Sequence, residues 1–167
     1  MEQFERAGWP RLECLMIDHL GFVQPSAHYR GNRNNEIGEI TRTLKGYAKE
    51  YGLAIVLLSQ LSRQLTQRED KRPQLSDLRE SGSIEQDADV VMFVFREEYY
   101  VNNKKPREGT EEFFAWEAEM NRVHGKAEVI LGKQRHGPTG TVELQFDANI
   151  TRFSNLAQSD RIPDQHM

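Results

Sequence analysis

Four short apolar segments recur along the chain, separated by polar and charged stretches. They are residues 12–17, 53–58, 90–95 and 127–131. Nearly continuous apolar runs of this length are typical of strands buried on both faces, as in a parallel sheet. Between the first two runs, residues 35–51 repeat apolar side chains with the period of a helix, and Gly52 stands where a helix commonly ends. The order strand, helix, strand predicts a parallel βαβ unit with a right-handed crossover.

The connection that follows the second run is long. Residues 59–88 contain no comparable strand, and a connection of this length inside a compact domain is usually functional. We expect a short helix to begin at Ser83, because Ser83 and Gln86 have the spacing of a capping box. Residues 97–126 are highly charged and contain a helical patch of large apolar side chains. The members of that patch are Phe113, Trp116, Met120 and Val123.

The C-terminal third predicts a hairpin. Residues 137–140 read Gly-Pro-Thr-Gly, a turn signal with proline at its second position. The segment 141–146 then alternates apolar and polar residues, as a half-buried strand does, and residues 150–153 add an edge strand. Residues 1–7 are expected to be the end of a helix, and residues 158–167 a polar, disordered tail. Both ends therefore look like cuts through a longer protein.

Composition narrows the class of protein. The chain has 167 residues, which suits one domain with its own core, and a net charge of −4 from 22 basic and 26 acidic side chains. Its single cysteine, Cys14, has no partner for an internal disulfide, which favours a reducing compartment. No apolar run approaches the roughly 20 residues of a membrane span. The acidic balance disfavours a generic nucleic-acid binder but leaves a local basic site open.

Two polar side chains follow the first two apolar runs. Asp18 comes directly after Leu-Met-Ile, as in a Walker B segment, and Gln60 comes two residues after the second run. Strands of an α/β sheet end at the ligand crevice, where a carboxylate can hold Mg²⁺ and a glutamine can sense a γ-phosphate or orient a water. Each pattern taken alone also fits an ordinary strand end, with a solvated aspartate and a loop glutamine bonded to backbone.

Two basic groups are further candidates. Lys133 and Arg135 follow the fourth run, flank one residue and can point the same way toward an anion. Arg79 and Glu80 precede Gly82, whose backbone can approach a phosphodiester closely. A solvated basic turn and a charged surface loop remain open for these two groups. The five histidines show no metal-ligand spacing, so no zinc site is predicted, and no GxxxxGK[ST] phosphate-binding loop occurs in the sequence.

Together, in this order, these segments resemble the bacterial replicative DNA helicases, the DnaB-type, RecA-like hexameric motors. The resemblance rests on LMIDHL, EIGEITRTLKGYAKEYG, VLLSQLSRQLTQREDKRPQLSDLRESGSIEQDADVVMFVFREEYY, AEVILGKQRHGPTGTVELQF and TRFSNL. The block RPQLSDLRESGSIEQDAD is highly specific, since recombinases and other RecA-like ATPases share only the general strand layout. The resemblance implies an α/β, RecA-like P-loop NTPase core, with a largely parallel sheet flanked by helices and a C-terminal antiparallel hairpin.

The resemblance also implies roles for single residues. Asp18 is expected to act on Mg²⁺ beside ATP, and Gln60 to couple the nucleotide state to DNA-binding loops. Arg79, Glu80 and Gly82 are expected to track the backbone of single-stranded DNA. Lys133 and Arg135 are expected to reach the ATP of a neighbouring subunit, with Arg135 as arginine finger, which requires a ring.

This resemblance implies a hexameric bacterial helicase with 5′–3′ polarity that is cytoplasmic and nucleoid-associated. It also implies a primase and a helicase loader as partners. Residues 1–157 are then the C-terminal portion of its ATPase domain, and the N-terminal half with the Walker A loop is expected before Met1. His19 and Gly21 depart from the tyrosine and glutamine that are usual in the family. Residues 101–126 form a charged helical insertion that is longer than in many members of the family. We expect this chain alone not to be a competent ATPase.

Two other classes stay open. The chain could be a non-catalytic module that binds single-stranded DNA or helicase protomers. It could also belong to a RecA-like ATPase of the recombinase type, although the block RESGSIEQDAD argues against this. We also expect truncation to leave apolar strand faces exposed, which favours association of the isolated chain.

Overall fold

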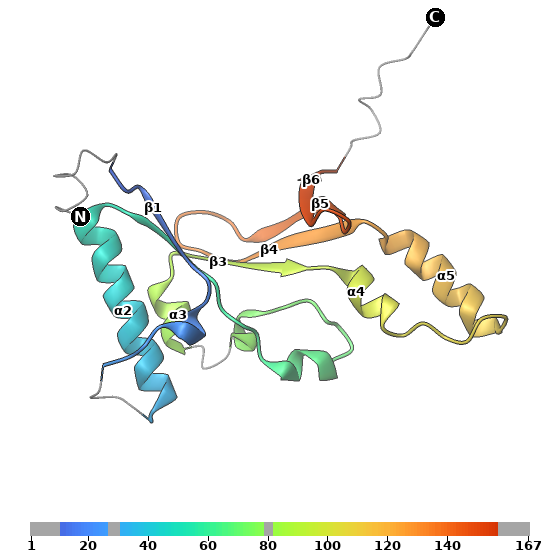
Figure 1. The fold of residues 1–167 in the computed structure, drawn as a ribbon, viewed down its shortest axis with the longest axis horizontal. Helices are drawn as coiled ribbons and strands as arrows, with labels where there is room; N and C mark the ends of the chain where they lie inside the picture. Colours follow the sequence, from blue (N-terminus) through green and yellow to red (C-terminus); the bar gives the residue numbers. More distant parts are fainter. Residues whose placement is uncertain (1–10, 27–30, 79–81, 157–167) are drawn as a thin grey trace, which may run out of the picture. The chain divides into compact units, whose positions relative to one another are not determined.

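The computed structural model describes residues 11–26, 31–78 and 82–156 (Figure 1). Its elements are β1 (Cys14–Ile17), the 3₁₀ turn η1 (Leu20–Phe22), α2 (Arg33–Tyr51), β2 (Ala54–Leu57), η3 (Arg63–Gln67), η4 (Leu75–Asp77), α3 (Gly82–Asp87), β3 (Val90–Phe95), α4 (Glu97–Asn102), α5 (Glu111–Val123), β4 (Lys126–Gln134), β5 (Gly140–Asp147) and β6 (Arg152–Asn155). The predicted end of a helix in residues 1–7 and the predicted tail at 158–167 lie outside the described residues.

Two compact units make up the described chain. The first contains the described residues up to Gln67 together with Gln74–Val91, and the second contains Arg68–Pro73 and the residues from Met92 onward. The boundary falls inside β3, and the segment 68–73 belongs to the second unit although the chain on both sides of it belongs to the first.

The predicted βαβ arrangement is confirmed in the first unit. β1 and β2 pair in parallel, with Cys14 opposite Ala54 and Ile17 opposite Leu57. The crossover helix α2 begins after Asn32, whose side chain accepts a hydrogen bond from the Asn35 N–H at 3.3 Å. It ends at Gly52, which adopts the left-handed conformation with φ 61° that glycine tolerates best.

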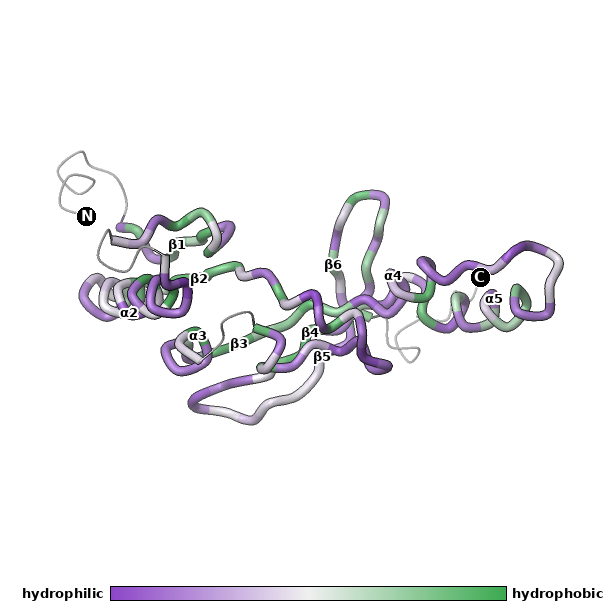
Figure 2. The backbone as a smooth tube through the Cα atoms, turned by 90° about the horizontal axis from the view of Figure 1, so that it is seen from below, coloured by the Kyte–Doolittle hydropathy of each residue, from purple (hydrophilic) through white to green (hydrophobic). Residues whose placement is uncertain are grey.

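Burial of the strands differs from the prediction. The sequence predicts strands buried on both faces, yet exposure alternates along β1, β2 and β3. Met16 is 67% exposed and Met92 60% exposed, whereas Phe93 between exposed neighbours is buried. Figure 2 shows these strands as hydrophobic stretches in an otherwise largely hydrophilic chain. The expectation is wrong because the described chain covers only one face of each strand, and apolar runs of this kind need a layer on both.

The second unit is built on one sheet in the order β3-β4-β5-β6. The predicted C-terminal hairpin is confirmed, since β4 and β5 pair antiparallel and β6 adds an antiparallel edge strand. Phe146 is buried and its ring contacts that of Phe153 of β6. The guanidinium carbon of Arg96 lies 3.9 Å from the centroid of the Phe146 ring. Beside the sheet, the Nε1–H of Trp116 donates to the carbonyl of Val101 at 2.8 Å and ties α5 to α4.

Three boundaries differ from the sequence reading. Ser83 lies inside α3 and is not its N-cap, because the helix already begins at Gly82. β4 extends to Gln134, so Lys133 is part of the strand and only Arg135 follows it. The turn falls at residues 135–136, and Gly140 of the predicted turn already begins β5. The start of β5 follows from strand pairing, in which Gly140 lies opposite Leu131 of β4. The local turn signal does not reveal this pairing.

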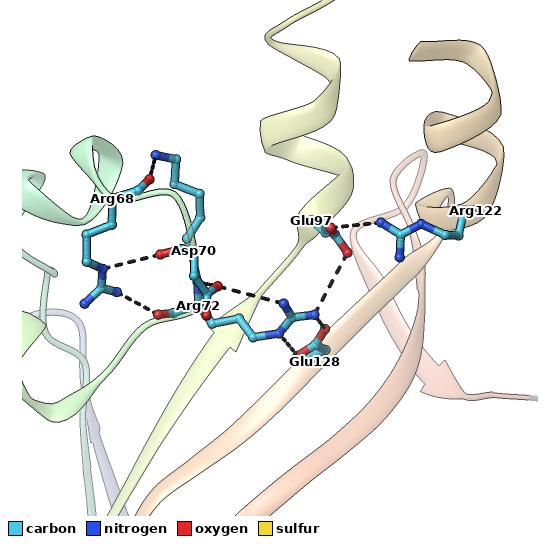
Figure 3. A network of polar contacts seen from close by, with 7 residues as sticks. Arg68, Asp70, Arg72, Glu97, Arg122 and Glu128 are labelled. Carbon is cyan, nitrogen blue, oxygen red and sulfur yellow. Dashed lines mark hydrogen bonds and ion pairs between the residues drawn. The ribbon is translucent and has the colours of Figure 1, made fainter. Parts of the chain in front are cut away.

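The segment Arg68–Pro73 is anchored to the sheet of the second unit by Arg72 (Figure 3). The Arg72 guanidinium donates two hydrogen bonds to Glu128 of β4, at 3.0 and 2.7 Å. The hydrogen bond to Glu128 raises the pKa of Arg72 above its ordinary value. Glu97 of α4 lies 4.0 Å from the same guanidinium and 3.0 Å from Arg122 of α5. One arginine thus joins a loop, a strand and a helix that are distant in sequence.

A second charge cluster makes the stability of this unit depend on pH. Glu98 accepts hydrogen bonds from Arg96 at 2.9 Å and is 2.7 Å from the Nδ1 of His124. Burial raises the pKa of Glu98, but the hydrogen bonds from Arg96 and His124 outweigh it and hold this pKa below its ordinary value. The carboxylate therefore stabilises the folded chain at a pH above the ordinary glutamate pKa. This contribution disappears as the pH falls through the lowered value.

We expect Glu98→Gln to reduce the free energy of unfolding near neutral pH, and the difference from the native chain to shrink as the pH falls below about 4. Urea unfolding at a series of pH values measures both quantities. Glu119→Gln, on an exposed position of α5, is the control. A difference between Glu98→Gln and the native chain that stays constant from neutral to acid pH would contradict the expectation.

Candidate functional site

Asp18 and Gln60 lie at the same edge of the β1–β2 pair. Each follows the carboxyl end of its strand, and the two strands run parallel. Pairing continues past the strand ends, because the Leu58 N–H donates to the Ile17 carbonyl at 3.0 Å and the Leu20 N–H donates to the Leu58 carbonyl at 2.8 Å. The structure therefore brings these two sequence-predicted residues to one place, where a parallel sheet presents its ligand crevice.

His19 sits between these two candidates. Its Nδ1 accepts a hydrogen bond from the Gly21 N–H at 3.0 Å, and its Nε2 is 3.4 Å from the side-chain amide nitrogen of Gln60. The imidazole also packs against Phe22, with 4.6 Å between ring centroids. The peptide bond between Asp18 and His19 is cis.

An open depression of about 350 Å³ lies at this edge, entirely within the first unit. Its lining residues are His19, Leu20, Gly21, Arg33, Ile37, Ser59 and Gln60. Its polar side chains include an imidazole, an amide and a guanidinium, which are groups that can bind a polar or anionic ligand. Arg33 also pairs with Glu36 at 3.3 Å, which offsets part of its charge.

The donor set at this edge fits Mg²⁺ held jointly with a nucleotide. Asp18 is exposed at the end of β1, and the described residues contain no group of three or more acidic, histidine or cysteine side chains that could hold a metal. Mg²⁺ is usually bound through one or two carboxylates, with the remaining positions filled by phosphate oxygens and water. A single exposed carboxylate therefore suits a metal that arrives with a phosphate ligand.

The proposed DNA-contact residues are only partly described. Arg79 and Glu80 lie outside the described residues, whereas Gly82 begins α3 and is exposed. Helix α3 is held on α2 by a partly buried hydrogen bond in which the Thr41 hydroxyl donates to Asp87 at 2.6 Å. An ion pair between Lys45 and Asp89 supports the same contact.

The close approach of the two helices requires a glycine on α2. A Cβ at Gly38 would lie 2.9 Å from the Ser83 hydroxyl, closer than a carbon atom tolerates. Sequence reasoning missed both Gly38 and Thr41. The available signal was a threonine within the apolar stripe of the helix, because a buried hydroxyl there needs a hydrogen-bond partner.

Lys133 and Arg135 belong to the second unit, whereas Asp18 and Gln60 belong to the first. Lys133 is half-buried in β4, and Arg135 is exposed directly after it. Because Arg135 lies in the turn and not in the strand, the shared direction of the two side chains stays a prediction.

Comparison with known proteins gives a consistent result. A family model described as "DnaB-like helicase C terminal domain" matches residues 2–155. The replicative DNA helicase DnaB of Rickettsia typhi is 48% identical over 145 residues, which cover 87% of this chain and 29% of that protein. The Haemophilus influenzae protein of the same name is 45% identical over 155 residues, covering 93% of this chain and 29% of that protein.

Solved structures agree with the sequence relatives. The chain is similar to "The Structure Of A DnaB-Like Replicative Helicase And Its Interactions With Primase", with a TM-score of 0.74, 40% identity, and coverage of 93% of this chain and 34% of that one. It is also similar to a second solved chain, described as an ATPase domain, with a TM-score of 0.74, 41% identity, and coverage of 93% and 49%. The chain thus spans less than a third of these curated relatives.

Every helix in the described ranges is too short or too polar to cross a membrane.

We expect Thr41→Val to destabilise the chain by about 1–2 kcal/mol, because it removes a buried donor from the Asp87 carboxylate without changing the side-chain volume much. Backbone amides of α3 should exchange with solvent faster in this variant. Thr43→Val, on an exposed position of the same helix, is the matched control. Equal α3 exchange rates in the two variants would show that the Thr41–Asp87 bond does not hold α3.

Proposed function

Because the chain belongs to the DnaB-like helicase C-terminal domain family, we propose that it forms part of a replicative DNA helicase. Such a protein unwinds duplex DNA at the replication fork by ATP-driven 5′–3′ translocation on single-stranded DNA. The observation that supports this most directly is the parallel pairing of β1 with β2, because Asp18 and Gln60 each follow the carboxyl end of one of these strands.

ATP and Mg²⁺ are the ligands that fit this proposal. Asp18 holds Mg²⁺, through water or directly, and the metal supplies positive charge to the phosphates when it is bound. Gln60 contacts the γ-phosphate or the attacking water and relays the nucleotide state into the connection that follows it. The depression lined by His19, Arg33 and Gln60 supports this assignment, because its polar groups suit an anion.

The remaining candidates act on other partners. Arg79, Glu80 and Gly82 contact the backbone of single-stranded DNA, by charge and by close backbone approach. Lys133 and Arg135 reach a nucleotide bound by a neighbouring subunit of a homo-hexamer, with Arg135 stabilising the charge on the transferring phosphoryl group. A primase is a further proposed partner, since a similar helicase has been solved with interactions of that kind. A helicase loader is also proposed.

The isolated chain is proposed not to hydrolyse ATP by itself. Its sequence contains no GxxxxGK[ST] loop, whose backbone N–H groups and lysine cradle the phosphates. The recombinase-type alternative is not favoured, because the relatives are named replicative helicases. A non-catalytic DNA-binding role of the isolated chain remains an outcome that the following experiments separate.

We expect no turnover of ATP above background by the isolated chain with single-stranded DNA. A chimaera in which residues 12–155 replace the matching segment of the Rickettsia typhi helicase should hydrolyse ATP. In that chimaera, Asp18→Ala and Arg135→Ala should each abolish hydrolysis, and Arg135→Ala should leave nucleotide binding mostly intact. Hydrolysis by the isolated chain that Asp18→Ala removes would overturn the inactive-fragment proposal, and a chimaera indifferent to both substitutions would overturn the assigned roles.

If the isolated chain binds single-stranded DNA through Arg79, its affinity should fall steeply with salt, because phosphate contacts release counterions. Fluorescence anisotropy with labelled oligo(dT) measures the slope. Arg79→Met should flatten the slope by about one unit. Arg107→Met, an exposed arginine beyond α4, should leave the slope unchanged. Negligible binding at all salt concentrations would exclude the non-catalytic DNA-binding role.

A further inference from the structure

Both ring nitrogens of His19 are in polar contact, and the two contacts make opposite demands on the ring. The Gly21 N–H donates to Nδ1 at 3.0 Å, so Nδ1 has a free lone pair and carries no proton. A neutral imidazole has one N–H, which must therefore reside on Nε2. Nε2 of the ring faces the side-chain amide nitrogen, Nε2, of Gln60 at 3.4 Å.

The proton on Nε2 decides how the Gln60 amide is turned. An N–H donor needs an acceptor opposite it, and the acceptor of a glutamine side chain is its carbonyl oxygen. The oxygen and nitrogen of an amide are assigned from the hydrogen-bond network around them. Two N–H donors cannot bond each other, so the tautomer of His19 requires the amide to be turned from the orientation with Nε2 toward the ring to the one with Oε1 toward it. This orientation leaves both amide N–H donors of Gln60 for other groups.

We propose that His19 is a positioning residue that fixes the amide orientation of Gln60. With its oxygen engaged by His19, Gln60 offers N–H donors to a ligand in the depression that both residues line. Donors suit phosphate oxygens, whereas an exposed amide oxygen would repel them. The inference rests on the proposed function, in which Gln60 senses a γ-phosphate, and it identifies the residue that prepares Gln60 for an anion.

Gly21 holds the imidazole in this orientation. A Cβ at position 21 would lie 2.6 Å from Cε1 and 2.9 Å from Nδ1 of His19, so any larger residue collides with the ring. Unlike Gly52, Gly21 does not have a positive φ, so the ring and not the backbone requires glycine there. Phe22 packs on the ring with 4.6 Å between centroids. His19 and Gly21 thus form one structural unit.

The first test needs neither ATP nor DNA and uses the native chain. Long-range ¹H–¹⁵N correlation spectra of the histidine rings at about pH 8, where an unperturbed imidazole is neutral, report the tautomer. We expect His19 to carry its proton on Nε2, with a bare Nδ1. A proton on Nδ1 would overturn the inference. This measurement requires no substitution, so it stands even where a variant fails to fold.

Two variants separate the contacts of the ring. His19→Asn keeps a short acceptor for the Gly21 N–H but cannot reach Gln60, and Gly21→Ala displaces the ring from both. Both substitutions should shift the side-chain amide resonances of Gln60. Phe22→Leu changes neither ring nitrogen of His19, so with the tautomer retained it should leave these resonances unchanged. Unchanged Gln60 resonances in His19→Asn would show that the ring does not orient the amide.

The chimaera described above gives the functional readout. We expect His19→Asn to lower kcat by at least about threefold with a smaller change in KM, and to have no further effect when Gln60 is already alanine. Additive effects of the two substitutions would overturn the positioning role. An inactive chimaera combined with the expected His19 tautomer and Gln60 shifts would instead overturn the proposed function, and leave the pairing of His19 with Gln60 supported.

Discussion

The parallel pairing of β1 with β2 is the constraint on which the candidate site depends. Parallel strands end at the same edge, so a register with Ile17 opposite Leu57 places whatever follows each strand side by side. Two residues that are far apart in the sequence, Asp18 and Gln60, come to the same edge of the strand pair for this reason. A slip of register would shift Gln60 along the edge and break its contact with His19.

The crossover helix gives this pairing its support. α2 is capped at both ends by local signals, Asn32 and Gly52, and its buried stripe includes Ile37 and Ile40. The same helix contacts α3 through Gly38 and Thr41. α2 therefore supports both the β1–β2 pair and the helix that begins at Gly82. The second unit is stabilised instead by aromatic packing and by charge clusters. In one of these clusters, Arg72 donates two hydrogen bonds to Glu128.

Apolar side chains that remain on the surface show where the described chain is incompletely covered. Met16 and Val56 lie on one face of the β1–β2 pair, and Met92 and Val94 on one face of β3. The apolar runs suit strands with layers on both sides, and the folded chain provides one. This agrees with the expectation that such faces favour association, which stays a prediction.

From the sequence alone, the order of strands and helices, the βαβ unit, the C-terminal hairpin and the positions of Asp18 and Gln60 could be predicted. Hydrophobic periodicity and glycine caps are local, so they can be read residue by residue. The end of β4 beyond Lys133, the one-sided burial of the strands and the start of α3 were decided only by tertiary structure, because they depend on which segments pair and pack. The link from Gly21 through His19 to Gln60 is of the same kind. No local sequence pattern predicts this link, because it exists only where strand pairing brings an imidazole, a glycine and an amide within hydrogen-bond distance.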